Sequence, residues 1–177
     1  MAEYAIRPAT LDDLQPLTDI YNHYVVHTPV SLDLEPFTPA ERREWFDKHA
    51  AAGPHRLFVA VDVDGRLLGY ASSSRWRPKR AYDTTVEVSV YCDPHATGRG
   101  CGTALYDALF AALAREDVHT VVAGISLPNP ASQSLHKKFG FRSVGIFHAV
   151  GRKFDRFWDV EWFERPLNPD RQEGKRM

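Results

Sequence analysis

The sequence has few cysteines and no long apolar run. Only two of its 177 residues are cysteines, Cys92 and Cys101. Two thiols cannot form the disulfide framework of a small secreted domain, so we expect both to stay reduced. No apolar run is long enough to cross a bilayer, and no basic segment followed by an apolar one marks an export signal. We therefore expect a cytoplasmic protein that does not bind a membrane.

The charges of the chain nearly cancel. Lys and Arg together number 22, against 23 Asp and Glu, for a formal net charge of −1. Nothing in this balance favours nucleic acid as a partner, and any anion site must be local. The length fits one domain, which we place at residues 1–167. We expect residues 168–177 to form a polar C-terminal tail.

Apolar periodicity and turn residues predict a mixed α/β domain with a partly antiparallel sheet. Thr38-Pro39 and Asn129-Pro130 each predict a helix start, because an N-cap residue precedes a proline at the first helical position. Helices are expected from Thr10 to about residue 26, from Thr38 to about 52, from the turn before 105 to about 116, and from Asn129 to Gly140. Strands are expected at 4–7, 57–63, 66–74, 84–92, 120–127, 141–150 and 158–166, the last two joined by a polar turn.

A glycine-rich turn at residues 95–105 is the most informative stretch. Gly98, Gly100 and Gly102 fall between a predicted strand and a predicted helix. Glycine reaches positive φ and lets a ligand approach the backbone, and a helix start has unpaired N–H groups. The stretch therefore predicts a phosphate-binding turn. It lacks the Lys-Ser/Thr ending of a P-loop and the spacing of a dinucleotide motif, and a tight connection without a ligand is the alternative.

In this order of elements, the turn resembles that of the GCN5-related N-acetyltransferase superfamily. The family motif Gln/Arg-x-x-Gly-x-Gly/Ala corresponds here to residues 97–102, with Thr97 in place of the long polar residue. The phosphinothricin N-acetyltransferase branch is matched at Tyr82-Asp83, Thr85-Val86-Glu87, Val90-Tyr91, Leu127-Pro128-Asn129, His136 and Trp158-Asp159-Val160. The resemblance implies the superfamily fold, a mixed, mostly antiparallel sheet flanked by about four helices.

The resemblance also implies a reaction. Members of this branch transfer the acetyl group of acetyl-CoA directly to the α-amino group of phosphinothricin, methionine sulfoximine or methionine sulfone. It implies acetyl-CoA as cosubstrate, no metal, a small amino-acid acceptor and a homodimer. The alternatives are another amine, such as a protein N-terminus or a polyamine, and a CoA-binding module without catalysis. Leu32 and Asp33 stand where phosphinothricin users carry an aromatic–arginine pair, which leaves the acceptor open among small polar amino acids.

Glu87 and His136 are the candidate catalytic residues. An ammonium group must lose a proton before it attacks a thioester, and the thiolate takes one on leaving. The resemblance makes Glu87 the general base, acting through water, and partial burial would raise its pKa toward the working range. His136 stands where many members carry a tyrosine acid and could protonate the thiolate. A solvated carboxylate and a histidine bonded to its neighbours are the structural alternatives.

The remaining candidates are binding residues that match the family. Because superfamily members splay the sheet at Val90 to Cys92, backbone groups there would bind pantetheine and the acetyl carbonyl. The cosubstrate set is Val90, Tyr91, Cys92, Thr97, Gly98, Arg99, Gly100, Cys101, Gly102, Thr103, Asn129 and Ser132. The substrate set is Arg77, Lys79 and Tyr82. Two cations and a phenol on one loop could bind the carboxylate and the second polar head of an amino acid. The alternative is a solvated basic loop. We expect both cysteines to be small buried side chains rather than acyl carriers.

Overall fold

The computed structural model describes residues 4–96 and 98–168. Its strands are β1 (Tyr4–Pro8), β2 (Leu57–Asp62), β3 (Leu67–Arg75), β4 (Thr85–Cys92), β5 (Thr120–Ser126), β6 (Arg142–Lys153) and β7 (Arg156–Pro166). Its α-helices are α1 (Leu14–His27), α2 (Pro39–Asp47), α3 (Cys101–Leu113) and α4 (Pro130–Lys138). Short 3₁₀ turns lie at Leu11–Asp13, Arg80–Tyr82 and Pro94–Ala96. The predicted order of strands and helices is confirmed.

The strands form one sheet in the order β1-β2-β3-β4-β5-β7-β6. Every neighbouring pair is antiparallel except β4 and β5. The parallel pairing joins Thr85–Glu87 to Thr120–Val122 and stops there. Beyond Glu87, β4 continues to pair with β3 as far as Cys92. The sheet is thus open between β4 and β5 along the last part of β4, as the resemblance implied.

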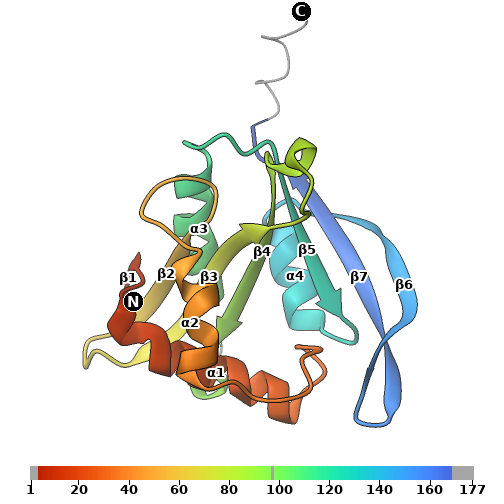
Figure 1. Ribbon diagram of the computed structural model, residues 1–177, viewed down its shortest axis with the longest axis horizontal. Coiled ribbons are helices and arrows are strands. Elements are labelled where there is room, and N and C mark those ends of the chain that lie inside the picture. Colours follow the sequence, from red (N-terminus) through yellow and green to blue (C-terminus); the bar gives the residue numbers. More distant parts are fainter. Residues whose placement is uncertain (1–3, 97, 169–177) are drawn as a thin grey trace, which may run out of the picture.

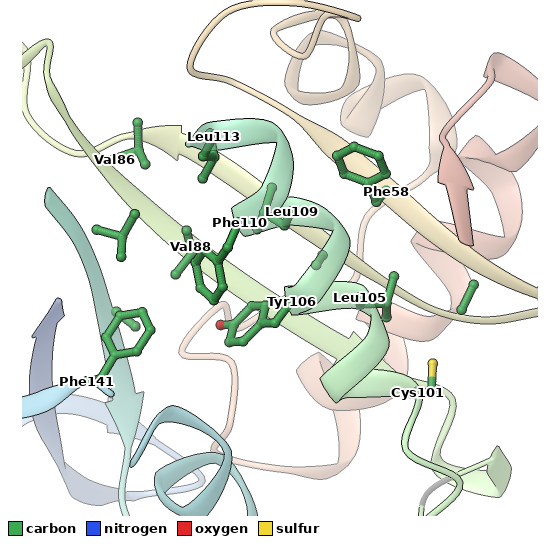
Figure 2. Close-up of a cluster of buried hydrophobic side chains, with 14 of the residues drawn as sticks. Phe58, Val86, Val88, Cys101, Leu105, Tyr106, Leu109, Phe110, Leu113 and Phe141 are labelled. Atoms are coloured by element: carbon green, nitrogen blue, oxygen red, sulfur yellow. The ribbon is translucent and has the colours of Figure 1, made fainter. Parts of the chain in front are cut away.

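Helices cover both faces of the sheet, with α1 and α2 in front and α3 and α4 behind in Figure 1. The core behind the sheet, drawn in Figure 2, packs leucines of α3 against valines of β4: Leu105, Leu109, Leu113, Val86 and Val88. The core in front holds Leu17, Ile20, Leu57, Val59, Leu67 and Tyr70. Successive strand residues point to opposite faces. The alternation that buries the β4 valines therefore turns Glu87, Ser89 and Tyr91 toward α1 and α2.

Both predicted cap-and-proline helix starts are confirmed. The Glu41 N–H donates to Thr38 Oγ1 at 3.3 Å, and the Glu41 carboxylate accepts from the Thr38 N–H at 2.7 Å, which forms a capping box. The Ser132 N–H donates to Asn129 Oδ1 at 3.2 Å. The predicted end of the second helix near residue 52 is wrong, because α2 ends at Asp47. The chain then turns back, and the Ala50 N–H donates to the His55 carbonyl at 3.0 Å.

The last two strands form a longer hairpin than predicted. Only Phe154 and Asp155 lie between β6 and β7, with φ of 53° and 55°, which is the pattern of a tight type I′ turn. The predicted wide polar turn is therefore wrong. Lys153, expected in that turn, is buried at the end of β6, and its Nζ donates to the Ser31 carbonyl at 2.7 Å. This bond ties the hairpin to the loop between α1 and α2.

The predicted tail lies almost wholly outside the described residues. Its first residue, Asn168, belongs with the domain, since its Nδ2 donates to the Val118 carbonyl at 2.9 Å. No helix in the described part of the chain is long and apolar enough to cross a membrane. Over the same residues, no cluster of His, Cys, Asp and Glu could hold a metal ion.

Candidate active site

The glycine-rich turn forms an anion-binding helix start. Gly98 and Gly100 have φ of 79° and 78°, and Gly100 is the N-cap of α3. A side chain in that left-handed conformation would be strained, so the turn requires glycine at both positions. The N–H groups in the first turn of α3 have no acceptor within the helix and lie at its positive end. Lys138 adds a cation here, its Nζ donating to Thr103 Oγ1 at 3.3 Å.

A cavity of about 410 Å³ lies where β4 and β5 separate. Its walls come from those two strands and from the first turns of α3 and α4. The predicted cosubstrate residues among its lining are Val90, Tyr91, Cys92, Gly98, Gly100, Cys101, Gly102, Thr103, Asn129 and Ser132. Arg99 is exposed beside it, and Thr97 falls outside the described residues. The cavity joins an anion-binding end to a strand edge free to hydrogen-bond an extended arm, features that suit acetyl-CoA.

The two cysteines differ in burial. Cys101 is buried, as predicted, whereas Cys92 is only half-buried and forms part of the cavity wall. Tyr24, which the sequence did not single out, also lines the cavity, and its hydroxyl donates to the Cys92 carbonyl at 2.6 Å. This bond fixes the end of β4 where the strand has lost its β5 neighbour.

Glu87 faces a second cavity, of about 320 Å³. This cavity shares Val30, Tyr91, Gly124 and Ser126 with the first, so the two adjoin. Burial raises the pKa of Glu87, and the nearby positive charge of Arg77 opposes that rise. Glu87 is therefore a half-buried carboxylate at the last paired position of the β4–β5 ladder, in the wall of an open cavity.

His136 and Tyr106 form a hydrogen-bonded pair in the wall of the first cavity. His136 is 3% exposed, and its Nδ1 lies 2.8 Å from the Ser132 carbonyl oxygen. Because a carbonyl only accepts, Nδ1 carries the proton, and Nε2 of the neutral ring accepts from the Tyr106 hydroxyl at 3.0 Å. Burial lowers the pKa of His136. Tyr106 was missed because its helical spacing to Leu109 and Leu113 is that of a core residue.

The predicted substrate loop lies outside both cavities. Arg77 and Lys79 are exposed, and Tyr82 is 39% exposed. The loop is ordered around Trp76, whose ring lies 5.1 Å from the Arg77 guanidinium and 5.2 Å from the Tyr82 ring. Arg77 is the member whose charge acts on Glu87. The structure thus links one of the three residues to the Glu87 cavity.

Comparison with known proteins gives the class of this protein. The model of the acetyltransferase (GNAT) family matches residues 17–141. The chain therefore belongs to the GNAT family of acetyltransferases, an assignment that confirms both the fold and the enzyme class inferred from the sequence.

Several proteins with assigned names are similar to this chain in sequence or structure. The phosphinothricin N-acetyltransferase of Streptomyces coelicolor is 57% identical over 167 residues, covering 94% of this chain and 98% of the relative. The L-methionine sulfoximine/L-methionine sulfone acetyltransferase of Pseudomonas paraeruginosa is 38% identical over 94% of this chain and 96% of its own. A crystal structure of a GNAT superfamily phosphinothricin acetyltransferase from Sinorhizobium meliloti in complex with acetyl-CoA superposes with a TM-score of 0.88 at 32% identity, covering 93% of this chain and 89% of that one.

Proposed function

We propose that this enzyme transfers the acetyl group of acetyl-CoA to the α-amino group of a small polar amino acid or analogue, of the phosphinothricin, methionine sulfoximine or methionine sulfone type. The observation that carries the proposal is the opening between β4 and β5, with Glu87 at its start. The two adjoining cavities give the cosubstrate and the acceptor separate spaces that meet at this opening.

In this proposal the thioester lies along β4, with the pyrophosphate at the first turn of α3. Bound acetyl-CoA supplies an activated acetyl group. Glu87 then removes a proton from the acceptor ammonium, directly or through water, and its raised pKa suits this step. Val90 to Cys92 offer backbone groups along the open strand edge, and Asn129 and Ser132 add polar groups at the start of α4.

The acid step uses His136 through Tyr106. The resting ring of His136 is neutral, so Nε2 first takes up a proton from solvent through the cavity. The imidazolium Nε2–H then donates to the Tyr106 hydroxyl, which in turn donates its own hydrogen to the departing sulphur. The sulphur gains a proton, His136 becomes neutral and Tyr106 is unchanged, so the transfer balances. The 3.0 Å contact between the two side chains supports this relay.

The wall of the acceptor cavity includes an apolar and an acidic residue from the loop between α1 and α2. Leu32 and Asp33, which depart from the pair carried by phosphinothricin users, both line it. Leu32 packs so tightly on Gly151 of β6 that a Cβ there would lie 2.5 Å from its Cδ1. The hairpin therefore fixes Leu32 in the cavity wall, and we expect the acceptor to pair an apolar stem with a polar head.

Thiol release from acetyl-CoA over a panel of amines tests the acceptor class. We expect the highest kcat/KM with methionine sulfoximine, methionine sulfone or phosphinothricin, because Glu87 and the nearby Arg77 suit the ammonium and the carboxylate of a zwitterion. Polyamines and peptides with free N-termini are the comparison substrates. Turnover confined to those comparison substrates would contradict the proposal.

We propose further that the enzyme is a homodimer assembled through the β6–β7 hairpin. β6 is an edge strand, and large apolar side chains of the hairpin are exposed: Val144, Ile146, Phe147, Val150, Phe154 and Phe157. Figure 1 shows the hairpin extending beyond the rest of the sheet. A long apolar edge strand tends to pair with another chain, and a second copy would cover it.

Phe147→Asp is expected to convert the dimer to a monomer, because a carboxylate would replace an apolar ring that is 59% exposed on this surface. Light scattering coupled to size-exclusion chromatography measures the change. Val63→Asp is the matched control, since Val63 is 75% exposed in the turn after β2. A wild-type chain that elutes as a monomer at micromolar concentration would overturn the dimer proposal.

A further inference from the structure

Arg42 is a buried cation without a carboxylate partner among the described residues. It lies in α2 and is 6% exposed. Its guanidinium carbon stands 4.2 Å from the centroid of the Tyr21 ring and 4.1 Å from that of Trp45, so the group is held between two aromatic faces. Its Nε is buried without a hydrogen-bond partner. A buried cation without a counter-charge is destabilising, so an anion bound beside Arg42 would stabilise the fold.

Three other arginines have the carboxylate partner that Arg42 lacks in the part of the chain that the structure describes. Arg7, Arg56 and Arg66 each form an ion pair with a carboxylate. Arg42 instead lines a third cavity, of about 240 Å³. The Tyr70 hydroxyl lines the same cavity and is buried, and the nearby charge of Arg42 opposes the rise in its pKa that burial causes. The Arg42 guanidinium and the Tyr70 hydroxyl thus lie together at one cavity.

The rest of that cavity offers mostly hydroxyls: Ser72, Ser74 and Ser89. Two carboxylates also line it, but both already accept hydrogen bonds. Asp33 Oδ2 accepts from the Tyr21 hydroxyl, and Glu41 Oε2 accepts from the backbone and side chain of Thr38. Neither forms an ion pair with Arg42 within the described chain. Among the described residues, a bound anion would therefore displace no ion-pair partner of this guanidinium.

The strand register connects this cavity to the Glu87 cavity. Ser74 pairs with Glu87, Ser72 with Ser89, and Tyr70 with Tyr91 across β3 and β4, so all six side chains share one face. Tyr21, Asp33 and Tyr91 line both cavities. At a rise of about 3.3 Å per residue, Ser89 stands about 7 Å and Tyr91 about 13 Å along the strand from Glu87. The distance of about 7 Å from Glu87 to Ser89 is within the reach of a small extended amino acid.

We propose that Arg42 and Tyr70 form an anion subsite that binds an acidic head of the acceptor, a carboxylate or a phosphinate, while the amine of the same molecule faces Glu87. This inference rests on the proposed function, since it assumes an acceptor amine at Glu87. The planar guanidinium suits two oxygens of one head group, and the aromatic rings on either side hold it in place.

Arg42→Met tests the subsite, because methionine fills the space between the rings but carries no charge. We expect KM for the acceptor to rise about 10- to 100-fold, the range of charged hydrogen bonds, with kcat and the KM for acetyl-CoA nearly unchanged. Arg43→Met is the matched control, since its neighbour Arg43 is half-exposed and paired with Asp47. Tyr70→Phe, which removes one hydroxyl, is expected to raise the same KM by a smaller factor.

Acceptor pairs identify which head binds. If Arg42 holds the α-carboxylate, the KM effect of Arg42→Met disappears with methionine sulfone carboxamide. If it holds a side-chain anion, the effect is larger for phosphinothricin than for methionine sulfone. Equal acceptor KM values in the wild type, Arg42→Met and Tyr70→Phe would overturn the subsite.

Binding of simple anions separates this inference from the proposed function. If no acceptor is turned over, the proposed function fails, and titration of the wild type with acetate and methylphosphinate still tests the subsite by the shift in Tm. A shift that is lost in Arg42→Met but kept in Arg43→Met supports it. Identical shifts in all three proteins would contradict it.

Discussion

Glu87→Gln is expected to lower kcat by about 10²- to 10⁴-fold near neutral pH, the range of general acid–base catalysis, with little change in the KM for acetyl-CoA. The amide keeps the shape of the carboxylate but cannot take a proton. Glu87 faces the acceptor cavity, so its loss leaves the helix-start site for the cosubstrate intact. Steady-state thiol release at saturating acceptor measures the effect.

The pH profile gives a second test of Glu87. A general base must be ionised, so kcat falls as the pH drops through its pKa, and burial places that fall above the ordinary range of a carboxyl group. We expect the acidic limb to disappear from the residual activity of Glu87→Gln. Glu161→Gln is the control, because Glu161 is also a buried carboxylate, on β7, bonded to Gln133 at 2.7 Å outside all three cavities.

Stability measurements separate lost chemistry from lost folding. A carboxyl group whose pKa is higher in the folded state than in the unfolded state destabilises the fold above the unfolded pKa, because the unfolded chain gives up that proton more readily. Burial raises the pKa of Glu87 in this way. Glu87→Gln should therefore keep or increase the free energy of unfolding at pH 7 in urea. A variant of equal stability with kcat within twofold of the wild type would contradict the role of Glu87 as base.

Local chemistry made much of the fold predictable. The caps at Thr38 and Asn129 and the alternation along β4 depend on neighbours within a few residues, and the structure has them as predicted. The turn of the last hairpin was predicted too wide because Phe154 adopts a positive φ without being glycine or asparagine. The cross-strand pairing of β6 with β7 imposes that conformation, and no local pattern signals it.

The residues of the candidate site also differ in whether local sequence or tertiary packing identifies them. Glu87 and the glycine turn lie in one short stretch of sequence and each matches a family pattern, so both could be identified from the chain. Arg42 sits within the charged stretch 41–44, which reads as a solvated helix face. Only the packing of α2 on the sheet encloses its guanidinium. Tyr106 is similar, because its partner is 30 positions away and contact between α3 and α4 is not encoded in either helix alone.

Tyr106→Phe is expected to lower kcat about 10²-fold or more, because it removes the hydroxyl that links His136 to the departing sulphur. The variant keeps the ring and so the packing of α3, at a loss of about 1 kcal/mol in the free energy of unfolding from the broken hydrogen bond. His136→Asn should cause a similar drop in kcat. Because the two side chains act in one relay, the double variant should be little slower than either single variant.

Tyr24→Phe provides the matched comparison for Tyr106. Tyr24 lines the same cavity, but its hydroxyl donates to the Cys92 carbonyl rather than to an ionisable group. We expect its removal to change kcat only a few-fold, mainly through looser packing at the end of β4. Effects of equal size at Tyr106 and Tyr24, or strictly multiplicative effects of Tyr106→Phe and His136→Asn, would show that the pair is structural and that the thiolate takes its proton from solvent.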